Sequence, residues 1–121
     1  MYLEHYGLAT RGPDAYPRDG RLRVADGLWI VGDPAGPELH THQGHYQGEI
    51  AVRMALGQDV RPDYRALPRA TYTDPEAASV GLTLDKALEA GYDAYECVAD
   101  FTRSSKGYSV EADTGHVTIV V

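Results

Sequence analysis

The stretch LWIVGDPAG, Leu28 to Gly36, joins a short apolar run to an abrupt polar stop. Its first four residues are too few for a helix and are typical of a strand that is covered on both faces. Pro34 lacks a backbone donor and ends that strand. Gly32 lets a ligand approach the backbone because it has no Cβ, and Asp33 can accept hydrogen bonds from a polyhydroxyl chain. Ligands of open α/β sheets bind at the carboxyl ends of strands, so a ligand contact at Gly32 and Asp33 is one interpretation. The plainer interpretation is that Asp33 only caps a turn before Pro34, and these residues alone leave both open.

A helix is predicted after this stretch, from Gln43 to Leu56. Tyr46, Ile50 and Met54 recur every four residues, which is the spacing of one helix face, and Gly57 is a natural stop. The N-terminus of this helix would point at the same edge as the preceding carboxylate. Helix N-termini stabilise negative charge, so this one suits a ligand on which such charge develops.

The composition narrows the class of protein. The chain has 121 residues with 43% hydrophobic and 24% charged content, which is typical of a globular domain or parts of two. A net charge of −7 argues against a nucleic-acid partner, because neutralising phosphates needs a basic face. No apolar run approaches the length of a membrane span. Cys97 is the single cysteine, which fits a reducing, cytoplasmic setting and excludes a redox dithiol within the chain.

The second half of the chain predicts short strands. Gly57 to Ala70 carries two prolines and little periodicity, so we interpret it as a linker and the main boundary. Ala70 to Thr73 and Ala77 to Leu82 then predict two short strands, and Thr83 is placed to cap a short helix. These signals predict a mainly antiparallel α+β unit after Ala70.

The remaining segments follow the same pattern. Tyr92 to Phe101 alternates like a strand, and Arg103 to Gly107 predicts a turn or loop. Gly115 to Val121 is a β-rich run that meets the C-terminus without a polar ending, which suggests a part of a longer protein. Earlier in the chain, Asp19-Gly20 predicts a hairpin turn, because glycine tolerates the positive φ of such turns.

Two segments resemble a known family. GLWIVGDPAGPELHTHQGHYQGEIAV, Gly27 to Val52, resembles the flavin-binding stretch of the pyridine nucleotide-disulfide oxidoreductases, and YTDPEAASVGLTLDKALEAGYD, Tyr72 to Asp93, resembles the start of their dimerisation domain. The two segments stand in the family's order at about the family's separation. The resemblance implies an α+β fold in which residues 1–60 are the C-terminal part of an FAD-binding α/β domain and residues 61–121 are the N-terminal part of a mainly antiparallel dimerisation domain.

The resemblance also implies site residues. In the family, the aspartate of the Gly-Asp pair holds a ribityl hydroxyl of FAD, and a following segment leads into a helix whose backbone donors meet the pyrimidine edge of the flavin. The residues at these positions here are Gly32, Asp33, Leu39, His40 and Thr41. The sequence departs from the family's pattern at Glu38 and His40, where apolar residues are commoner. A carboxylate at position 38 would oppose an anionic reduced flavin unless it turned outward.

The implied function is that of a fragment of an FAD-dependent oxidoreductase with NAD or NADP as electron partner, acting as a homodimer. The sequence contains no GxGxxG motif and no Cys-x4-Cys pair. The family's C-terminal His-Glu pair would lie beyond Val121. We therefore assign no catalytic residue and expect the chain alone to be inactive.

Two other functions remain open on the residues alone. HTHQGH, His40 to His45, could build a cupin-like metal site if it formed a strand, because His40 and His42 would then share one face. The plainer interpretation is a loop and a helix start, so no metal ligand is assigned. The second is a non-catalytic dimerisation module, to which the tyrosines of the second half would contribute an interface. Cys97 is interpreted as a small strand residue rather than a nucleophile.

Overall fold

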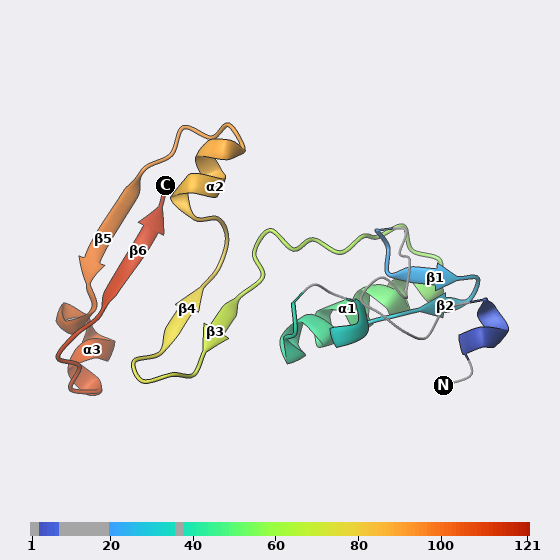
Figure 1. The fold of residues 1–121 in the computed structure, drawn as a ribbon, viewed down its shortest axis with the longest axis horizontal. Helices are drawn as coiled ribbons and strands as arrows, with labels where there is room; N and C mark the ends of the chain where they lie inside the picture. Colours follow the sequence, from blue (N-terminus) through green and yellow to red (C-terminus); the bar gives the residue numbers. More distant parts are fainter. Residues whose placement is uncertain (1–2, 8–19, 36–37) are drawn as a thin grey trace. The chain divides into compact units, whose positions relative to one another are not determined.

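The computed structural model describes residues 3–7, 20–35 and 38–121, and the chain divides into two compact units, Met1–Tyr64 and Arg65–Val121. Figure 1 shows the elements of each unit, coloured along the sequence. Beside two short 3-10 helices, η1 (Leu3–Tyr6) and η2 (Asp33–Ala35), the described part of the first unit holds one hairpin and one long helix. Asp19, half of the predicted hairpin turn, lies outside the described residues.

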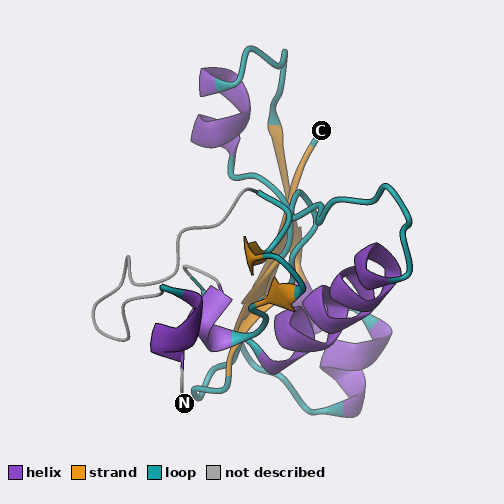
Figure 2. Cartoon of the chain, turned by 90° about the vertical axis from the view of Figure 1, so that its right-hand side faces the viewer, coloured by secondary structure: helices purple, strands orange, loops and turns teal. Residues whose placement is uncertain are grey.

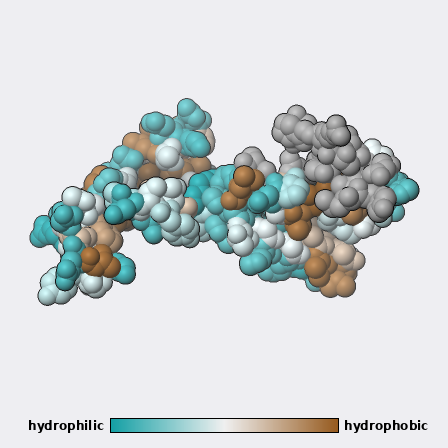
Figure 3. All heavy atoms as spheres, turned by 60° about the horizontal axis from the view of Figure 1, so that its bottom comes forward, coloured by the Kyte–Doolittle hydropathy of each residue, from teal (hydrophilic) through white to brown (hydrophobic). Residues whose placement is uncertain are grey.

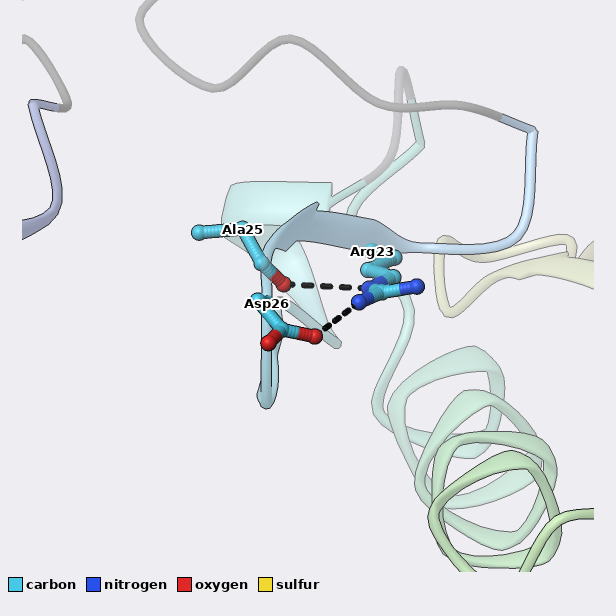
Figure 4. A network of polar contacts seen from close by, with 3 residues as sticks. All are labelled: Arg23, Ala25 and Asp26. Carbon is cyan, nitrogen blue, oxygen red and sulfur yellow. Dashed lines mark hydrogen bonds and ion pairs between the residues drawn. The ribbon is translucent and has the colours of Figure 1, made fainter.

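The first unit contains an antiparallel hairpin of β1 (Arg23–Ala25) and β2 (Leu28–Trp29), joined by a turn in which Gly27 has a φ of +69°. The Arg23 guanidinium donates to the carbonyl of Ala25, at 3.2 Å, and to the carboxylate of Asp26, which fastens the turn (Figure 4).

The prediction of a strand from Leu28 to Val31 covered on both faces is therefore wrong in two respects. The strand is two residues long, and its only described neighbour, β1, is antiparallel. Its side chains are half-buried rather than buried, and Val31 is exposed. Pairing with β1 satisfies the backbone of so short a strand from one side only, with one further bond from the amide of Ile30 to the carbonyl of Leu22.

Helix α1 (Thr41–Ala55) confirms the predicted helix and is the longest in the described chain (Figure 2). Beyond its last turn, Gly57 adopts a φ of +85° and donates its amide to the carbonyl of Met54, the ending expected of a glycine after a helix. The buried face of α1 is formed by Gln43, Gln47 and Ile50. This face is shifted from the predicted stripe, of which Tyr46 and Met54 are only half-buried.

The second unit begins with the antiparallel pair β3 (Arg69–Thr71) and β4 (Ala77–Ser79), in register from Arg69 opposite Ser79 to Thr71 opposite Ala77. Helix α2 (Leu84–Glu89) follows, and the Thr83 hydroxyl accepts the amide of Lys86 at 3.4 Å. Both predicted strands and the predicted cap are confirmed, with shorter strands than the sequence indicated.

A second antiparallel pair joins β5 (Glu96–Asp100) to β6 (His116–Val120) over five residue pairs without a bulge. Between them lie the 3-10 helix η3 (Phe101–Arg103) and α3 (Ser105–Ser109). The prediction of a strand in Gly115 to Val121 is confirmed.

The predicted loop at Arg103 to Gly107 is wrong, because α3 begins within it. The Ser104 hydroxyl accepts the amide of Gly107 at 2.9 Å and donates to the carbonyl of Phe101 at 2.7 Å. Gly107 packs so closely that a Cβ there would lie 2.2 Å from the Phe101 carbonyl oxygen. These contacts stabilise a helix too short to be recognised by periodicity.

The two units differ in how they bury apolar side chains. The first unit buries Leu22, Ala35 and Ile50, whereas the second buries only Leu67 and Ala87 among its apolar residues. Apolar side chains reach the surface of the second unit on the left of Figure 3. The antiparallel strands and short helices confirm the α+β class. Among the described residues, no helix is long and apolar enough to cross a membrane.

Candidate functional site

The turn that follows β2 brings the Gly-Asp pair against α1. Gly32 adopts a φ of +73°, a conformation that L side chains rarely adopt, and the 3-10 helix η2 (Asp33–Ala35) begins directly after it. A Cβ added to Gly44, in the first turn of α1, would lie 3.2 Å from the Gly32 Cα. Two glycines therefore let the strand end and the helix start pack backbone to backbone, and Asp33 is left exposed beside them.

Gln47 fixes this arrangement, and the sequence interpretation missed it. The Gly32 amide donates to the Gln47 Oε1 at 2.7 Å, and the Gln47 Nε2 donates to the Tyr64 hydroxyl at 2.9 Å. The Gln47 side chain is fully buried. A search for apolar residues passes over a glutamine. The signal that could have found it is the spacing of Gln43, Gln47 and Ile50, which places all three on one helix face.

The helical residues of α1 begin directly after His40. His40 occupies the N-cap position with an extended backbone, and its side chain makes no capping hydrogen bond. Thr41, the first helical residue, is exposed, and Leu39 is 70% exposed. A helix of 15 residues with such an end carries partial positive charge from its first amides. Negative charge on a ligand would be stabilised there.

Gln43 adds an unsatisfied acceptor to the same turn of the helix. Its side chain is 3% exposed, and its Oε1 accepts no hydrogen bond from any described residue. A buried polar atom without a partner costs free energy, so a ligand N–H at this position would be bound favourably. Leu39 and Thr41 lie at this helix start, as the resemblance implies, and Gly32 packs against it from the preceding turn.

The Glu38 carboxylate is paired with the neighbouring histidine. Its Oε2 lies 3.3 Å from the His40 Nε2, with 30% of the Glu38 side chain and 24% of the His40 side chain exposed. The His40 ring in turn stacks on that of His42, with centroids 5.1 Å apart. The two residues that depart from the family's pattern thus contact each other. The Glu38 carboxylate therefore has a neighbouring partner in the His40 ring.

The strand required by the cupin-like alternative is absent. His40 precedes α1, and His42 and His45 lie within it. No group of three histidine, cysteine or acidic side chains in the described parts of the chain is arranged to hold a metal ion. Cys97 lies in β5 as a free, exposed thiol.

The matches to known proteins extend over both units of the chain. Residues 67–121 match the family described as the pyridine nucleotide-disulphide oxidoreductase dimerisation domain. The chain is 32% identical over 121 residues to dihydrolipoyl dehydrogenase 2 of Haloarcula marismortui, covering 99% of this chain and 26% of that protein. It is 35% identical to the dihydrolipoyl dehydrogenase of Rhizobium etli, covering 98% of this chain and 25% of that protein.

Solved structures agree with this likeness. LpdA from Mycobacterium tuberculosis superposes with a TM-score of 0.81 and 25% identity over 98% of this chain and 26% of that one. The HOCl-induced flavoprotein disulfide reductase RclA from Escherichia coli has a TM-score of 0.77 at 23% identity, over the whole of this chain and 28% of that one, which shows a likeness of fold. The chain spans about a quarter of the length of the curated relatives it matches.

Proposed function

The chain belongs to the pyridine nucleotide-disulphide oxidoreductase family, and from this premise we propose that it contributes part of an FAD site and part of a homodimer interface to a flavin-dependent oxidoreductase. Its curated relatives are enzymes named dihydrolipoyl dehydrogenases. In the proposal, residues 1–60 are the C-terminal part of the FAD domain and residues 61–121 are the N-terminal part of the dimerisation domain. A cytoplasmic location belongs to the same proposal, supported by the single free cysteine.

One observation carries the flavin role. The exposed carboxylate of Asp33 follows a glycine that packs against the first turn of α1, and the N-terminus of that helix lacks a side-chain cap. A hydroxyl acceptor and a centre of positive potential thus lie at the same end of the helix. A flavin requires both, because its ribityl chain offers hydroxyl donors and its ring system gains negative charge on reduction.

The residues of the chain have separate roles in this site. Asp33 would accept a hydrogen bond from a ribityl hydroxyl, and Gly32 would leave room for the backbone to approach the cofactor. The segment Leu39 to Thr41 would present the first amides of α1 to the pyrimidine edge. The FAD, when bound, would carry electrons from NADH or NADPH to an oxidised substrate, or in the reverse direction from a reduced substrate to NAD or NADP.

Replacing Asp33 tests the proposal. In the flavoprotein that contains this chain, Asp33→Ala is expected to weaken FAD binding by about 1.5–3 kcal/mol, because a hydrogen bond to a charged acceptor is lost. The measurement is an FAD titration of the apoprotein followed by flavin fluorescence.

Asp59→Ala is the matched control. Asp59 forms an exposed ion pair with Arg21 at 2.7 Å in the same unit, and surface pairs contribute little. Equal FAD affinity for Asp33→Ala and the unsubstituted protein would refute the proposed role. The isolated 121-residue chain is expected to be colourless, because it contains no GxGxxG phosphate-binding motif.

A non-catalytic dimerisation module is the second candidate for the isolated chain. The observation that favours it is the exposed apolar surface of the second unit, where Tyr72, Val98 and Ile119 are 88%, 67% and 56% exposed. Surfaces of this kind are typical of association sites. This candidate predicts stable self-association without a bound chromophore.

A further inference from the structure

We infer that Gln47 is the positioning residue of this site, which holds the Gly32–Asp33 turn in place against α1 and ties both to the chain segment at Tyr64. Gln47 itself touches no ligand in this proposal. It acts through the backbone of the turn that presents the Asp33 carboxylate. The consequence for flavin binding rests on the proposed function, whereas the effect on the turn does not.

The chemistry of the two bonds requires an amide at this position. The Gly32 N–H can only donate, so it must face the carboxamide oxygen, at 2.7 Å. The carboxamide nitrogen must then find an acceptor, and the Tyr64 hydroxyl provides it at 2.9 Å. Both ends of the fully buried side chain are thereby satisfied. Neither an aliphatic side chain nor a carboxylate can accept and donate in this way.

The far end of the network is itself anchored to the helix. The Tyr46 hydroxyl accepts the amide of Asp63 at 2.8 Å, and the rings of Tyr46 and Tyr64 pack edge to face with centroids 6.3 Å apart. The segment at Tyr64 therefore has three contacts with α1, counting the bond from Gln47. A support of this kind limits the positions that Gln47 can adopt.

At the Gly32 end of the hydrogen-bond network, the turn has little freedom to move. Gly32 has a backbone conformation that glycine alone adopts readily, and on its other side it packs against Gly44. The bond from Gln47 is the one described hydrogen bond that joins the Gly32 amide to the helix. Its loss would let the turn separate from α1, and the carboxylate of Asp33 would move with it.

The test is hydrogen exchange of individual amides in the full 121-residue chain, measured by NMR. Gln47→Leu keeps the volume and removes both bonds. It is expected to speed exchange of the Gly32 amide about tenfold relative to the Gly57 amide, which is bonded to the Met54 carbonyl and serves as an internal reference. The matched control is Gln58→Leu, since Gln58 is exposed and its side-chain oxygen accepts a bond from the Arg53 side chain, at 2.9 Å.

A milder variant covers the case in which Gln47→Leu does not fold. Tyr64→Phe removes one oxygen from a side chain that is 39% exposed and leaves the Gln47 nitrogen without its acceptor. Exchange at Gly32 should then rise severalfold, less than in Gln47→Leu. Exchange that is unchanged in a folded variant, or that rises equally at Gly32 and along α1, would overturn the inference, because Gln47 would then contribute only to general stability.

A second measurement separates this inference from the proposed function. In the flavoprotein, Gln47→Leu should raise the FAD dissociation constant about tenfold, less than Asp33→Ala does. Faster exchange at Gly32 with FAD affinity unchanged in both variants would refute the flavin role and leave the positioning role standing. Weaker FAD binding in Asp33→Ala, with neither exchange nor affinity altered in Gln47→Leu, would refute the positioning role alone.

Discussion

Single residues at the contact between α1 and the turn after β2 determine where the candidate site lies. Gly32 and Gly44 allow two backbones to approach, and a buried glutamine supplies the hydrogen bond between them. None of these three side chains is charged or aromatic. The geometry of the exposed carboxylate at Asp33 thus depends on neighbours that carry little chemistry of their own.

The two glycines of α1 should respond differently to alanine. At Gly48 nothing lies within 4 Å of an added Cβ, so Gly48→Ala should stabilise the unit by about 0.5–1 kcal/mol through helix propensity. At Gly44 the same Cβ would lie 3.2 Å from the Gly32 Cα. Gly44→Ala should therefore be about 1 kcal/mol less stable than Gly48→Ala. Urea unfolding followed by the fluorescence of Trp29, the only tryptophan, measures the difference. Equal stability of the two variants would show that the turn can move away freely.

The sequence could predict the carboxylate but not its support. Gly-Asp after an apolar run is a local pattern, and its exposure follows from the turn. Gln47 is fifteen positions from Gly32 in the sequence, and the two residues meet only when the helix folds back on the turn. A polar side chain in a predicted surface position carries no sign that it is buried. Contacts of this kind depend on tertiary structure, so no short segment of the sequence predicts them.

At the scale of elements, the described chain is built from pairs of antiparallel strands and from helices, of which the short α2 and α3 have side-chain caps. Helix α1 was predictable because its periodicity extends over four turns. The strand β2 was predicted too long, because nothing in its apolar run reveals that only one antiparallel neighbour pairs with it. Helix α3 was missed because five residues are too few for a periodic signal. Its stability comes from the hydroxyl of Ser104.

Removing that hydroxyl should loosen the connection between β5 and β6. Ser104→Ala deletes the acceptor for the Gly107 amide and a donor to the Phe101 carbonyl, with an expected cost of about 1 kcal/mol. Amide exchange of Gly107, measured by NMR, should rise. Ser105→Ala is the control, because Ser105 is exposed in the first turn of α3. If both variants left the exchange of Gly107 unaltered, the cap would have no energetic role.

At the scale of the whole molecule, the second unit has only a small core, formed by Leu67 and Ala87. Its two sheets have two strands each, and isolated pairs of this size are marginal in water. Its exposed apolar side chains are spread along the unit, from Tyr72 after β3 to those on or beside α2, β5, α3 and β6. A further surface would bury them, and a second copy with two-fold symmetry is the commonest solution for identical chains.

We predict a discrete dimer formed by residues after Ala70. The net charge of −7 opposes open-ended aggregation. Ile119→Glu, on β6, should weaken dimerisation at least about tenfold, because a carboxylate would be buried without a partner. Val52→Glu, on α1, is the matched control, since Val52 is 60% exposed in the first unit. Sedimentation at micromolar concentration measures both. A monomer without concentration dependence would contradict the prediction and leave the second unit as a self-sufficient fold.

The close approach at Gly107 has a consequence for how the sequence can vary. Any side chain there would need the backbone at Phe101 to move, because the first carbon alone would lie 2.2 Å from a carbonyl oxygen. In a library with random residues at position 107, only the variants with glycine there should fold. At position 48, variants with many different residues should fold, because an added Cβ there has no neighbour within 4 Å. The 13 glycines of the 121-residue chain thus include both kinds of position, those with room for a side chain and those without.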